Sequence, residues 1–515
     1  MKIVFRVDAS LKIGSGHIVR SLTLAKELEK QGAKCRFLCR DLKGNLIKKI
    51  RQENFDVTVF PFSKKAKSFK ENNNTNLTYS SWLSVSWMED VKQTIDSLKT
   101  EKIDLLIVDH YGIGKQWEKK IRPYVKKIMV IDDLANRQHD CDLLLDQNLV
   151  SNFKTRYKNL LPKYCRTLLG PEFAILQNNY KDFYVNSPVR TGPIKRILVY
   201  FGNIDLNNLI ELTISAFNKL NRKNITLDIV TGFSSSSKNK IKKLSNKNKN
   251  IIFHSNLSSL ASLMLKADIA IGACGVTTWE RCCLGLPSIV ITVAENQKKI
   301  AKELDKLGII QWLDHYDKIT NERIYGALES LIDRNIETWS NTCKLITDGS
   351  GTQKVSSILS ANHKVRLKLR LAKFQDDKLL FNWANDPLVR SNAFNSKTIN
   401  KTTHKEWFQS RINNKKNCVI YILETKEKVP IGQVRFEKKN KIFYINYSLD
   451  SFVRGKNIGY IFLKKAIKRF KQNRRIRLIA EVKRENLASC KVFEKIGFRK
   501  SLKVKYGVNI FSYKL

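Results

Sequence analysis

The feature that most constrains the fold is the first segment of the chain, MKIVFRVDASLKIGSGHIVRS, where a short apolar run ends in a glycine-containing turn. Residues 3–5 predict a strand that carries the chain to the carboxyl edge of a parallel sheet. Gly14 and Gly16 can adopt positive φ there and let backbone amides approach an anionic ligand. A helix beginning near His17 points its positive end at the same place, so the segment predicts an α/β active-site loop. A tight turn with a surface histidine is the alternative interpretation.

Length and composition limit the number of domains, the cellular location and the role of the cysteines. A chain of 515 residues is too long for one hydrophobic core and is expected to form about three domains. Because no apolar run could span a bilayer and no apolar leader follows the first residues, we expect no membrane association, no secretion and a cytoplasmic location. The ten cysteines are scattered without a C-x-x-C pair, which favours reduced thiols over a disulfide framework or a zinc site. No metal is therefore expected.

The formal net charge is +47, from 94 Lys and Arg against 47 Asp and Glu. A charge of this size can indicate a nucleic-acid-binding protein. The lysines are spread along the whole chain, however, and stretches such as KNKIKKLSNKNKN at 238–250 are typical of solvated loops or helix faces. General surface basicity, which would also attract anionic substrates, is the favoured interpretation, and no dedicated nucleic-acid site is expected.

Strand-sized apolar runs alternate with helical periods up to about residue 293, which is typical of parallel sheets with helices on both faces. The first series comprises residues 3–5, 35–38, 56–60, 105–109, 128–132 and 143–146, and the second comprises 195–200, 226–231, 251–254, 269–272 and 288–293. The polar stretch 180–193, which contains Pro and Gly, suits a hinge between them. We therefore expect domains at 1–180 and 181–360, with the site in the cleft between the carboxyl edges of their sheets.

Beyond about residue 360 the pattern changes to antiparallel strands, expected at 365–371, 418–423, 431–437 and 443–449. A turn, RGKNIG at 454–459, then leads into a helix expected at 460–470. A strand at 476–482 and a short helix at 487–495 follow. This order predicts an α+β domain over residues 364–515.

A second glycine-containing loop, IGACGVTTWE at 271–280, follows an apolar strand and enters a helix. Its amides, around Gly275 and Thr277, are suited to bind phosphate. Glu280 lies one turn into the helix and can accept hydrogen bonds from both hydroxyls of a ribose, since each carboxylate oxygen takes a donor. Asn296 follows the next strand into the same cleft. A helix cap with a surface glutamate is the alternative interpretation.

Several segments of the chain resemble one enzyme family. The segments RVDASLKIGSGHIVRSLTLA, VDHYGIGKQWE, IDDLANRQHDCDLLLDQN, LLGPEFAIL and IAIGACGVTTWERCCLGLPS together resemble the UDP-sugar hydrolase of pseudaminic acid biosynthesis, over about residues 1–360. The resemblance implies two Rossmann-like domains of the GT-B type and a UDP-sugar as the small-molecule substrate. It also implies that His17 activates water for attack on the anomeric carbon, that Glu280 holds the nucleotide ribose and that Asn296 lies near the sugar.

The residues around His17 suit this chemistry. UDP is a good leaving group once its charge is met, so the main task is to position a water, and a histidine can accept its proton near neutral pH. Asp8, Asp109 and His110 are candidates for orienting the histidine, with strand-end caps as the alternative role of the aspartates. Asn203 stands where the family usually has a second glycine, a small change because Asn tolerates positive φ.

The chain from about residue 363 resembles the GNAT N-acetyltransferases, especially the enzyme that acts on the 4-amino group in the same pathway. FNWANDPLVR at 381–390 matches the opening helix of that subgroup, and NLAS followed by FEKIGF matches its final cofactor-binding motif. The turn at 454–459 matches the loop whose amides hold the pyrophosphate of acetyl-CoA. The resemblance therefore implies acetyl-CoA as cosubstrate and the following cofactor-binding residues: Arg454, Gly455, Gly459 and Asn486.

Two positions depart from the GNAT pattern. Asn457 replaces the middle glycine of the turn, and Phe493 stands where many members have the tyrosine that protonates the leaving thiolate. A phenyl ring cannot donate that proton. Tyr447, Tyr506, Tyr513 or water are the alternatives.

The leading hypothesis is a bifunctional enzyme with an α/β fold, in which two Rossmann-like domains of the GT-B type precede a GNAT α+β domain. The last domain would acetylate the 4-amine of a UDP-linked amino sugar, and the first two would then release UDP. A GT-B-like glycosyltransferase joined to a different acetyltransferase is one alternative. A basic nucleic-acid-binding protein is another, and the sugar stereoisomer and the choice of UDP or GDP stay open.

Overall fold

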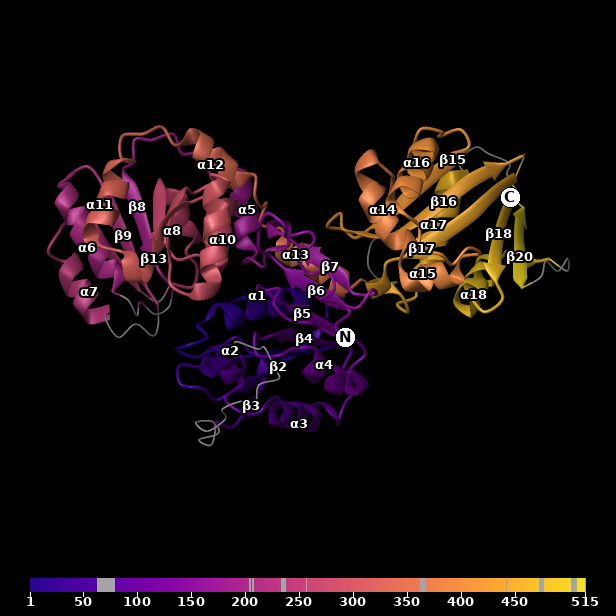
Figure 1. Ribbon diagram of the computed structural model, residues 1–515, viewed down its shortest axis with the longest axis horizontal. Helices are drawn as coiled ribbons and strands as arrows, with labels where there is room; N and C mark the ends of the chain where they lie inside the picture. The colour runs from indigo at the N-terminus through magenta and orange to yellow at the C-terminus, as the bar shows by residue number, and fades with distance from the viewer. Residues whose placement is uncertain are drawn as a thin grey trace. The chain divides into compact units, whose positions relative to one another are not determined.

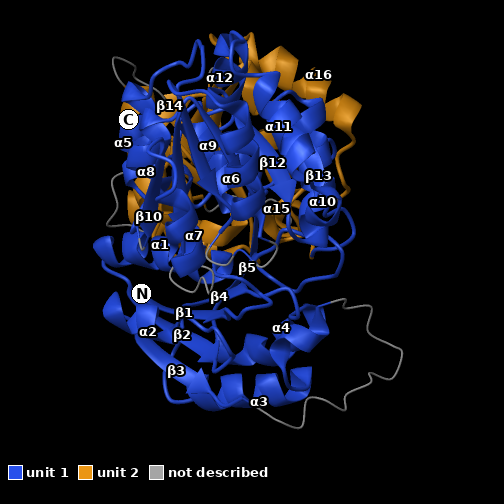
Figure 2. Ribbon diagram, turned by 90° about the vertical axis from the view of Figure 1, so that its left-hand side faces the viewer, with its two compact units in different colours: residues 1–161, 167–353 blue, residues 162–166, 354–515 orange. Residues whose placement is uncertain are grey.

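The computed structural model describes residues 1–62, 79–202, 205, 208–232, 238–255, 257–361, 367–440, 442–471, 477–501 and 507–514 (Figure 1). The chain divides into two compact units (Figure 2). Unit 1 comprises Met1–Leu161 and Thr167–Gln353, and unit 2 comprises Pro162–Arg166 and Lys354–Leu515. Unit 1 thus contains both predicted series of parallel strands, and unit 2 contains the predicted antiparallel strands.

The first sheet has the strand order β3-β2-β1-β4-β5-β6-β7, and its ladders from β3 to β6 are parallel. Its strands are β1 (Lys2–Val7), β2 (Lys34–Arg40), β3 (Asp56–Phe60), β4 (Leu105–Asp109), β5 (Ile128–Ile131), β6 (Leu143–Asp146) and β7 (Arg166–Leu169). The intervening helices are α1 (Gly16–Lys30), α2 (Ile47–Gln52), α3 (Trp87–Leu98) and α4 (Lys115–Ile121). The order reverses between β1 and β4, so the loops after these strands diverge and leave space for a ligand at the carboxyl edge.

The second sheet has the order β10-β9-β8-β11-β12-β13 and is parallel throughout. Its strands are β8 (Arg196–Tyr200), β9 (Thr226–Thr231), β10 (Ile251–Ser255), β11 (Ile269–Gly272), β12 (Ser288–Thr292) and β13 (Gln311–His315). The helices are α5 (Asn179–Asn186), α6 (Leu209–Leu220), α7 (Lys238–Ser245), α8 (Ala261–Lys266), α9 (Val276–Cys283), α10 (Glu295–Lys306), α11 (Asn321–Glu329), α12 (Glu337–Lys344) and α13 (Gly351–Leu359). This order reverses between β8 and β11, which places a second ligand-binding edge at the loop after β11.

Helices cover both faces of this second sheet. Ile197 and Val199 on β8 belong to one buried apolar cluster, while Leu198 between them belongs to another. Since successive side chains of a strand point to opposite faces, the run of apolar residues in β8 is the pattern of a strand buried on both sides. Gly272 ends β11, where a Cβ atom would lie 2.4 Å from the carbonyl oxygen of Tyr200, so this close approach of two strands requires glycine.

Unit 2 is built on a mixed sheet with the order β14-β15-β16-β17-β18-β20-β19. Its strands are β14 (Lys368–Leu371), β15 (Cys418–Glu424), β16 (Pro430–Lys439), β17 (Ile442–Leu449), β18 (Arg477–Lys483), β19 (Arg499–Lys500) and β20 (Val508–Lys514). The helices are α14 (Asp377–Ala384), α15 (Pro387–Asn392), α16 (Lys401–Ile412), α17 (Ile458–Lys471) and α18 (Leu487–Ile496). Only the β17–β18 ladder is parallel among the ladders of the described residues in this sheet.

The predicted strands at 105–109, 143–146, 226–231 and 269–272 are confirmed in their full extent. The strands β7, β13, β19 and β20 were not predicted. The predicted single opening helix at 381–390 is wrong, because the Asp386 side chain caps a second helix that starts at Pro387. Part of the predicted hinge is also helical, since α5 extends to Asn186.

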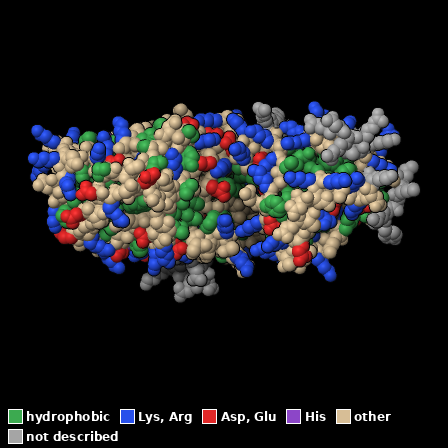
Figure 3. Space-filling model, turned by 90° about the horizontal axis from the view of Figure 1, so that it is seen from above, with side chains coloured by type: hydrophobic (Ala, Val, Ile, Leu, Met, Phe, Trp, Pro, Cys, Tyr) green, Lys and Arg blue, Asp and Glu red, His purple; other side chains and the backbone are tan. Residues whose placement is uncertain are grey.

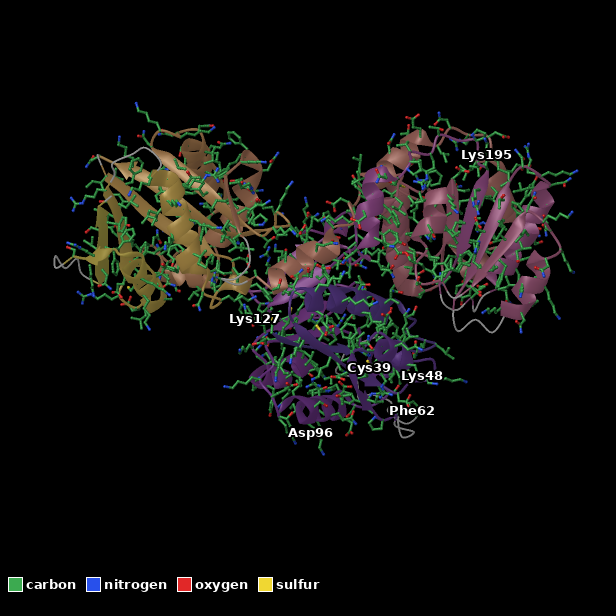
Figure 4. All side chains as sticks on the ribbon, turned by 180° about the vertical axis from the view of Figure 1, so that it is seen from behind. Cys39, Lys48, Phe62, Asp96, Lys127 and Lys195 are labelled. Atoms are coloured by element: carbon green, nitrogen blue, oxygen red, sulfur yellow. The ribbon has the colours of Figure 1, made fainter. Side chains whose placement is uncertain are left out.

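Basic side chains lie among other side chains across the face shown in Figure 3. Lys48 on α2 and Lys195 before β8 are both exposed, and Cys39 on β2 is buried (Figure 4). No disulfide joins the cysteines in the described part of the chain. In that same part, no helix combines the length and apolar character that crossing a membrane requires.

Candidate active sites

His17 lies at the carboxyl edge of the first sheet, where the strand order reverses. It is the second residue of α1, and Asp109 is the last residue of β4, the strand beside β1. The Nδ1 atom of His17 lies 2.6 Å from Oδ1 of Asp109, and both side chains are buried. The topology thus brings together a histidine and a carboxylate that are 92 positions apart in the chain.

Arg20 keeps Asp109 ionised. It donates through Nε to Oδ2 of Asp109 at 2.7 Å and through Nη2 to Oδ1 at 2.6 Å. Burial alone would raise the pKa of Asp109, but the charges of Arg20 and then His17 outweigh it and hold that pKa well below its usual range. An ionised carboxylate only accepts hydrogen bonds, so the ring proton of His17 is on Nδ1. Its Nε2 atom is therefore the basic nitrogen.

Aromatic side chains surround the imidazole of His17. The ring of Tyr111 lies edge-on to it with centroids 4.6 Å apart, and the Trp82 ring lies 6.2 Å away. Trp82 stacks on Tyr111 at 5.3 Å, and Tyr79 lies 4.8 Å from Trp82. Because Tyr79 and Trp82 are partly exposed, they offer an apolar surface beside the imidazole.

The glycine loop before α1 differs from the prediction at one position. Gly14 has φ +81°, and its N–H donates to the carbonyl of Ser10 at 2.8 Å. Gly16 does not have a positive φ, so the expectation of positive φ is wrong for this residue. The reason is that Gly16 is the first residue of α1 and has helical backbone. A Cβ atom at either glycine would meet nothing within 4 Å, so the space around the first turn of α1 is open.

Of the three candidates for orienting His17, only Asp109 contacts it among the described residues. Asp8 instead accepts a hydrogen bond from the backbone N–H of Arg40 at 2.7 Å and pairs with Arg6 at 2.8 Å. His110 Nε2 lies 3.4 Å from Asp8 Oδ2. Asp8 and His110 therefore belong to a buried network that supports the strand ends.

The loop after β11 forms the N-terminus of α9. Gly275 is the N-cap, and its N–H donates to Thr278 Oγ1 at 3.3 Å. Gly275 is exposed, a Cβ atom there would meet nothing within 4 Å, and Thr277 beside it is half-buried. The first turn of a helix has amides without intrahelical partners, so this loop can bind an anion.

Glu280 is a half-buried carboxyl group in α9. Burial raises its pKa to about 7, although a hydrogen bond from Tyr180 and the charge of Arg281 act in the opposite direction. Tyr180 comes from α5, the helix that includes part of the predicted hinge. Glu280 therefore changes its charge near neutral pH, a property common at functional sites.

Asn296 is the second residue of α10 and is half-buried. Its neighbour Glu295 is exposed and acts through its charge on one aromatic residue near His17. Burial and then the charge of Glu295 raise the pKa of Tyr79, which belongs to the aromatic surface described above. The start of α10 therefore lies near that surface.

Unit 2 contains a cavity of about 1230 Å³ that opens where two parallel strands separate. In the described residues, β17 and β18 pair only at Phe443–Leu478 and Tyr444–Ile479. Beyond these pairs, β17 from Ile445 and β18 from Glu481 both line the cavity. Separated strand edges can form hydrogen bonds with an extended ligand that contains amides.

Two residues of the turn before α17 have left-handed backbone. Gly455 has φ +76° and Asn457 has φ +56°. Asn enters the left-handed region more readily than most residues, so Asn457 can replace a glycine at this position. Turns of this type present successive amides to an anion.

Gly459 lies in the first turn of α17 and lines the cavity. A Cβ atom there would lie 3.7 Å from both the Tyr447 ring and the Val492 side chain. The absence of a side chain therefore keeps open the space between β17, α17 and α18, as a bound cofactor would require.

The side chains of Arg454 and Asn486 line the cavity but also hold its walls together. Arg454 donates to the Leu449 carbonyl at 3.0 Å, and its Nη2 atom lies 2.9 Å from Asp386 Oδ1. Asn486 caps α18 by accepting a hydrogen bond from the N–H of Ser489 at 3.2 Å. The charge of Arg454 is thus already matched by a carboxylate.

The aromatic residues near α18 divide into two groups. Phe493 and Tyr447 both line the cavity, with ring centroids 5.8 Å apart. Tyr513 stacks on Phe498 at 4.9 Å and is not among the described residues that line the cavity. Tyr506 and Asn203, both named from the sequence, lie outside the described residues.

Comparisons with known proteins find relatives for both parts of the chain. The glycosyltransferase family 28 C-terminal domain matches residues 196–340, and the acetyltransferase (GNAT) domain matches residues 366–499. The UDP-2,4-diacetamido-2,4,6-trideoxy-beta-L-altropyranose hydrolase of Campylobacter jejuni is 27% identical over 309 residues, covering 60% of this chain and 97% of that enzyme. This chain is a fusion that resembles a UDP-sugar hydrolase and ends in a GNAT domain.

The fusion as a whole also has a relative. An uncharacterized protein of Methanocaldococcus jannaschii is 25% identical over 531 residues, covering 98% of each chain. MurG of Acinetobacter baumannii aligns with 69% of this chain and 98% of its own, at 14% identity and a TM-score of 0.47. The domain matches and the two parallel sheets confirm the predicted fold class, two Rossmann-like domains of the GT-B type followed by a GNAT domain.

Some residues of the hydrolase-like part were missed from the sequence. Arg20 follows His17 by three residues on one helix, a spacing that puts both on the same face and could have indicated the contact. Tyr111 lies in a turn and Trp82 in a short 3-10 helix, Ser80–Leu83, and the approach of both to His17 depends on tertiary structure. In the described part of the chain, His, Cys, Asp and Glu side chains form no group suited to a metal ion.

Proposed function

We propose that the fusion is a bifunctional enzyme of pseudaminic acid biosynthesis. Its GNAT domain would transfer the acetyl group of acetyl-CoA to the amine of a UDP-4-amino-4,6-dideoxy-2-acetamido sugar. Its hydrolase-like part would then convert UDP-2,4-diacetamido-2,4,6-trideoxy-β-L-altropyranose to free sugar and UDP. The observation that carries the proposal is the presence, on one chain, of a GNAT domain and of a match to 97% of the Campylobacter hydrolase. Fusion would keep the product of the first step near the second site.

The His17–Asp109 pair supports the hydrolytic step. In the proposed reaction, Nε2 of His17 takes a proton from water as the water oxygen attacks the anomeric carbon. The bond from that carbon to the UDP oxygen breaks, and its electron pair leaves with UDP. The carboxylate of Asp109, 2.6 Å from Nδ1, stabilises the positive imidazole that forms.

The two helix N-termini of the hydrolase-like part are the proposed binding sites for the charged substrate. Amides near Gly14 and Gly16 and near Gly275 and Thr277 would meet the phosphates, because helix N-termini favour negative charge. Glu280 would accept the ribose hydroxyls, and Asn296 would lie near the sugar. The following arrangement supports these roles: both loops follow strands at which the strand order reverses, and Glu280 lies in the helix that Gly275 caps.

UDP affinity is expected to rise as the pH increases through about 7, the value to which burial raises the pKa of Glu280. Below that pH the carboxyl group is protonated and loses acceptor capacity for the ribose, so the gain between pH 6 and 8 should approach about tenfold. Isothermal calorimetry with UDP measures this gain. Glu280→Gln is the control, because this variant loses the titration of Glu280 while the titration of UDP itself is retained. If wild type and Glu280→Gln have the same pH profile, Glu280 does not hold the ribose.

The charges of the GNAT cavity support a nucleotide-linked acceptor over a polycationic amine. Among the described residues that line the cavity, the only carboxylate is Glu481. The cationic side chains that line it are Arg390, Arg435, Arg454, Lys483, Lys491 and Lys495. Arg390 donates to the Asn395 carbonyl at 3.2 Å, and its buried Nε atom makes no hydrogen bond. Arg454 pairs with Asp386, and Arg435 lies 3.2 Å from Glu437, so the net positive charge comes from the other four cations. Such a cavity attracts phosphates and repels polyamines.

Arg390→Gln is expected to raise KM for the UDP-linked amino sugar by about tenfold with little change in kcat, because a charge-assisted contact to phosphate would be lost in both ground and transition states. CoA affinity should not change. Arg499→Gln, which alters an exposed arginine of β19, is the matched control. Steady-state kinetics of CoA release measure both variants. An unchanged KM in Arg390→Gln would show that the acceptor's phosphates bind elsewhere.

A direct test of the proposed function combines both steps. The full chain is incubated with acetyl-CoA and the UDP-linked 4-amino sugar, and the products are followed by mass spectrometry. The expected result is first an added acetyl group and then free UDP with the diacetamido sugar. If the amino sugar is not acetylated while another amine is, the proposed acetyl acceptor is wrong.

A further inference from the structure

Acetyl transfer from a thioester to an amine releases a thiolate, and an acid near the sulfur assists its departure. The amine nitrogen bonds to the carbonyl carbon, the carbon–sulfur bond breaks, and its electron pair stays on the sulfur. The thiolate then gains a proton, while the nitrogen gives one to water. Phe493 cannot supply the proton, so it comes from another side chain or from water.

Two tyrosines are among the described residues that line the GNAT cavity, and their surroundings differ. The ring of Tyr460 lies 4.8 Å from the ammonium of Lys495, and its hydroxyl accepts a hydrogen bond from Lys464 at 3.5 Å. Tyr460 is thus contacted by one lysine from each of two helices, α17 and α18. Tyr447 lies on β17, three residues beyond Tyr444, the last residue of β17 that pairs with β18.

Tyr447 is held in place from several sides. Its hydroxyl lies 3.2 Å from Ser489 Oγ in the first turn of α18, and its ring packs edge-on against Phe493. Its ring is also next to Gly459, since a Cβ atom on that glycine would lie 3.7 Å from it. Tyr447 therefore occupies the space between the separated strands, the start of α17 and α18.

We propose that Tyr447 is the catalytic acid that protonates the departing CoA thiolate, with Ser489 fixing the direction of its hydroxyl. The inference rests on the acetyl transfer proposed above. The Tyr447 hydroxyl gives its proton to the sulfur as the carbon–sulfur bond breaks, and the phenolate recovers a proton from water. The Tyr447 ring lies beside Phe493, so a phenol from the strand replaces one that the helix lacks.

The protonation state of Tyr447 fits this role. Burial raises its pKa above the ordinary value for tyrosine, although the hydrogen bond with Ser489 acts in the opposite direction. The hydroxyl therefore carries its proton at neutral pH and can donate it. By the same reasoning, this phenol is unsuited to act as a base toward the amine.

Binding of CoA and of desulfo-CoA, which lacks the thiol, tests the contact without any acetyl acceptor. Wild type is expected to bind CoA about two- to tenfold more tightly than desulfo-CoA, the range for one neutral hydrogen bond. Tyr447→Phe should remove this preference, and Tyr513→Phe, which alters a tyrosine outside the cavity lining, should retain it. Isothermal calorimetry measures these affinities. Equal preference in wild type and Tyr447→Phe would overturn the inference.

Kinetics with the amino sugar complete the test. Tyr447→Phe is expected to lower kcat for CoA release by about tenfold or more, since a general acid contributes at least that much. Phe493→Tyr should retain activity alone and restore it in the Tyr447→Phe background. A kcat within twofold of wild type in Tyr447→Phe would overturn the inference. If Phe493→Tyr alone is active but the double variant Tyr447→Phe/Phe493→Tyr is as slow as Tyr447→Phe, the inference is also overturned. Wild type that releases no CoA with this acceptor would instead refute the proposed function.

Discussion

His17→Ala is expected to lower UDP release from the diacetamido UDP-sugar by about a hundredfold or more, the usual cost of removing a general base. The contact of Nδ1 with Asp109 at 2.6 Å leaves Nε2 as the basic nitrogen, and the substitution removes it. Acetyl transfer should not change, because His17 belongs to unit 1 and the GNAT cavity is lined by residues of unit 2. Parallel assays of UDP release and CoA release on one preparation measure both activities.

The second sheet provides a matched control for this variant. His254 on β10 lies 2.7 Å from Asp228 on β9, so it forms a comparable histidine–aspartate pair in the same unit. His254→Gln should leave UDP release within about twofold of wild type, as expected for a partly exposed side chain outside the site. Hydrolysis by His17→Ala within tenfold of wild type would show that His17 is not the base.

Much of the fold could be predicted because its elements have a strong local signal. The strand 105–109 begins with four apolar residues in a row, the pattern of a parallel strand buried on both faces, and 226–231 is rich in apolar and β-branched residues. The strand β13 was missed because Gln311–His315 mixes polar and apolar residues without alternation and lies at the edge of its sheet. The break between α14 and α15 depends on the cap formed by Asp386, although the following proline was visible in the sequence.

The candidate sites were predictable only in part. Glycine loops identified the regions of His17 and Gly275, because positive φ and helix N-termini follow from local sequence. The choice of Asp109 over Asp8 as the partner of His17 could not be made, since both aspartates follow buried strands and only strand order separates them. The pairing of Tyr447 with Ser489 likewise depends on two elements that are 42 positions apart.

Gly459→Asp is expected to abolish acetyl-CoA binding by the GNAT domain. The new side chain would enter the space beside Tyr447 and Val492, where a Cβ atom alone lies 3.7 Å from each. Its negative charge would repel the pyrophosphate at the N-terminus of α17, the position where amides otherwise attract it. A loss of affinity of at least about a hundredfold follows if the turn at Gly455 and Asn457 holds the pyrophosphate, since the charge replaces attraction by repulsion. Calorimetry with CoA measures it.

Gly459→Ala separates this effect from unfolding. Its Cβ atom would make ordinary contacts, and alanine favours a helix over glycine by about 1 kcal/mol, so this variant should melt at or above the wild-type temperature. CoA affinity should fall much less in Gly459→Ala than in Gly459→Asp, because no charge is added. UDP release should be the same in both variants, since the hydrolase-like part belongs to unit 1. If Gly459→Asp is folded and binds CoA as tightly as wild type, the pyrophosphate does not lie at the start of α17.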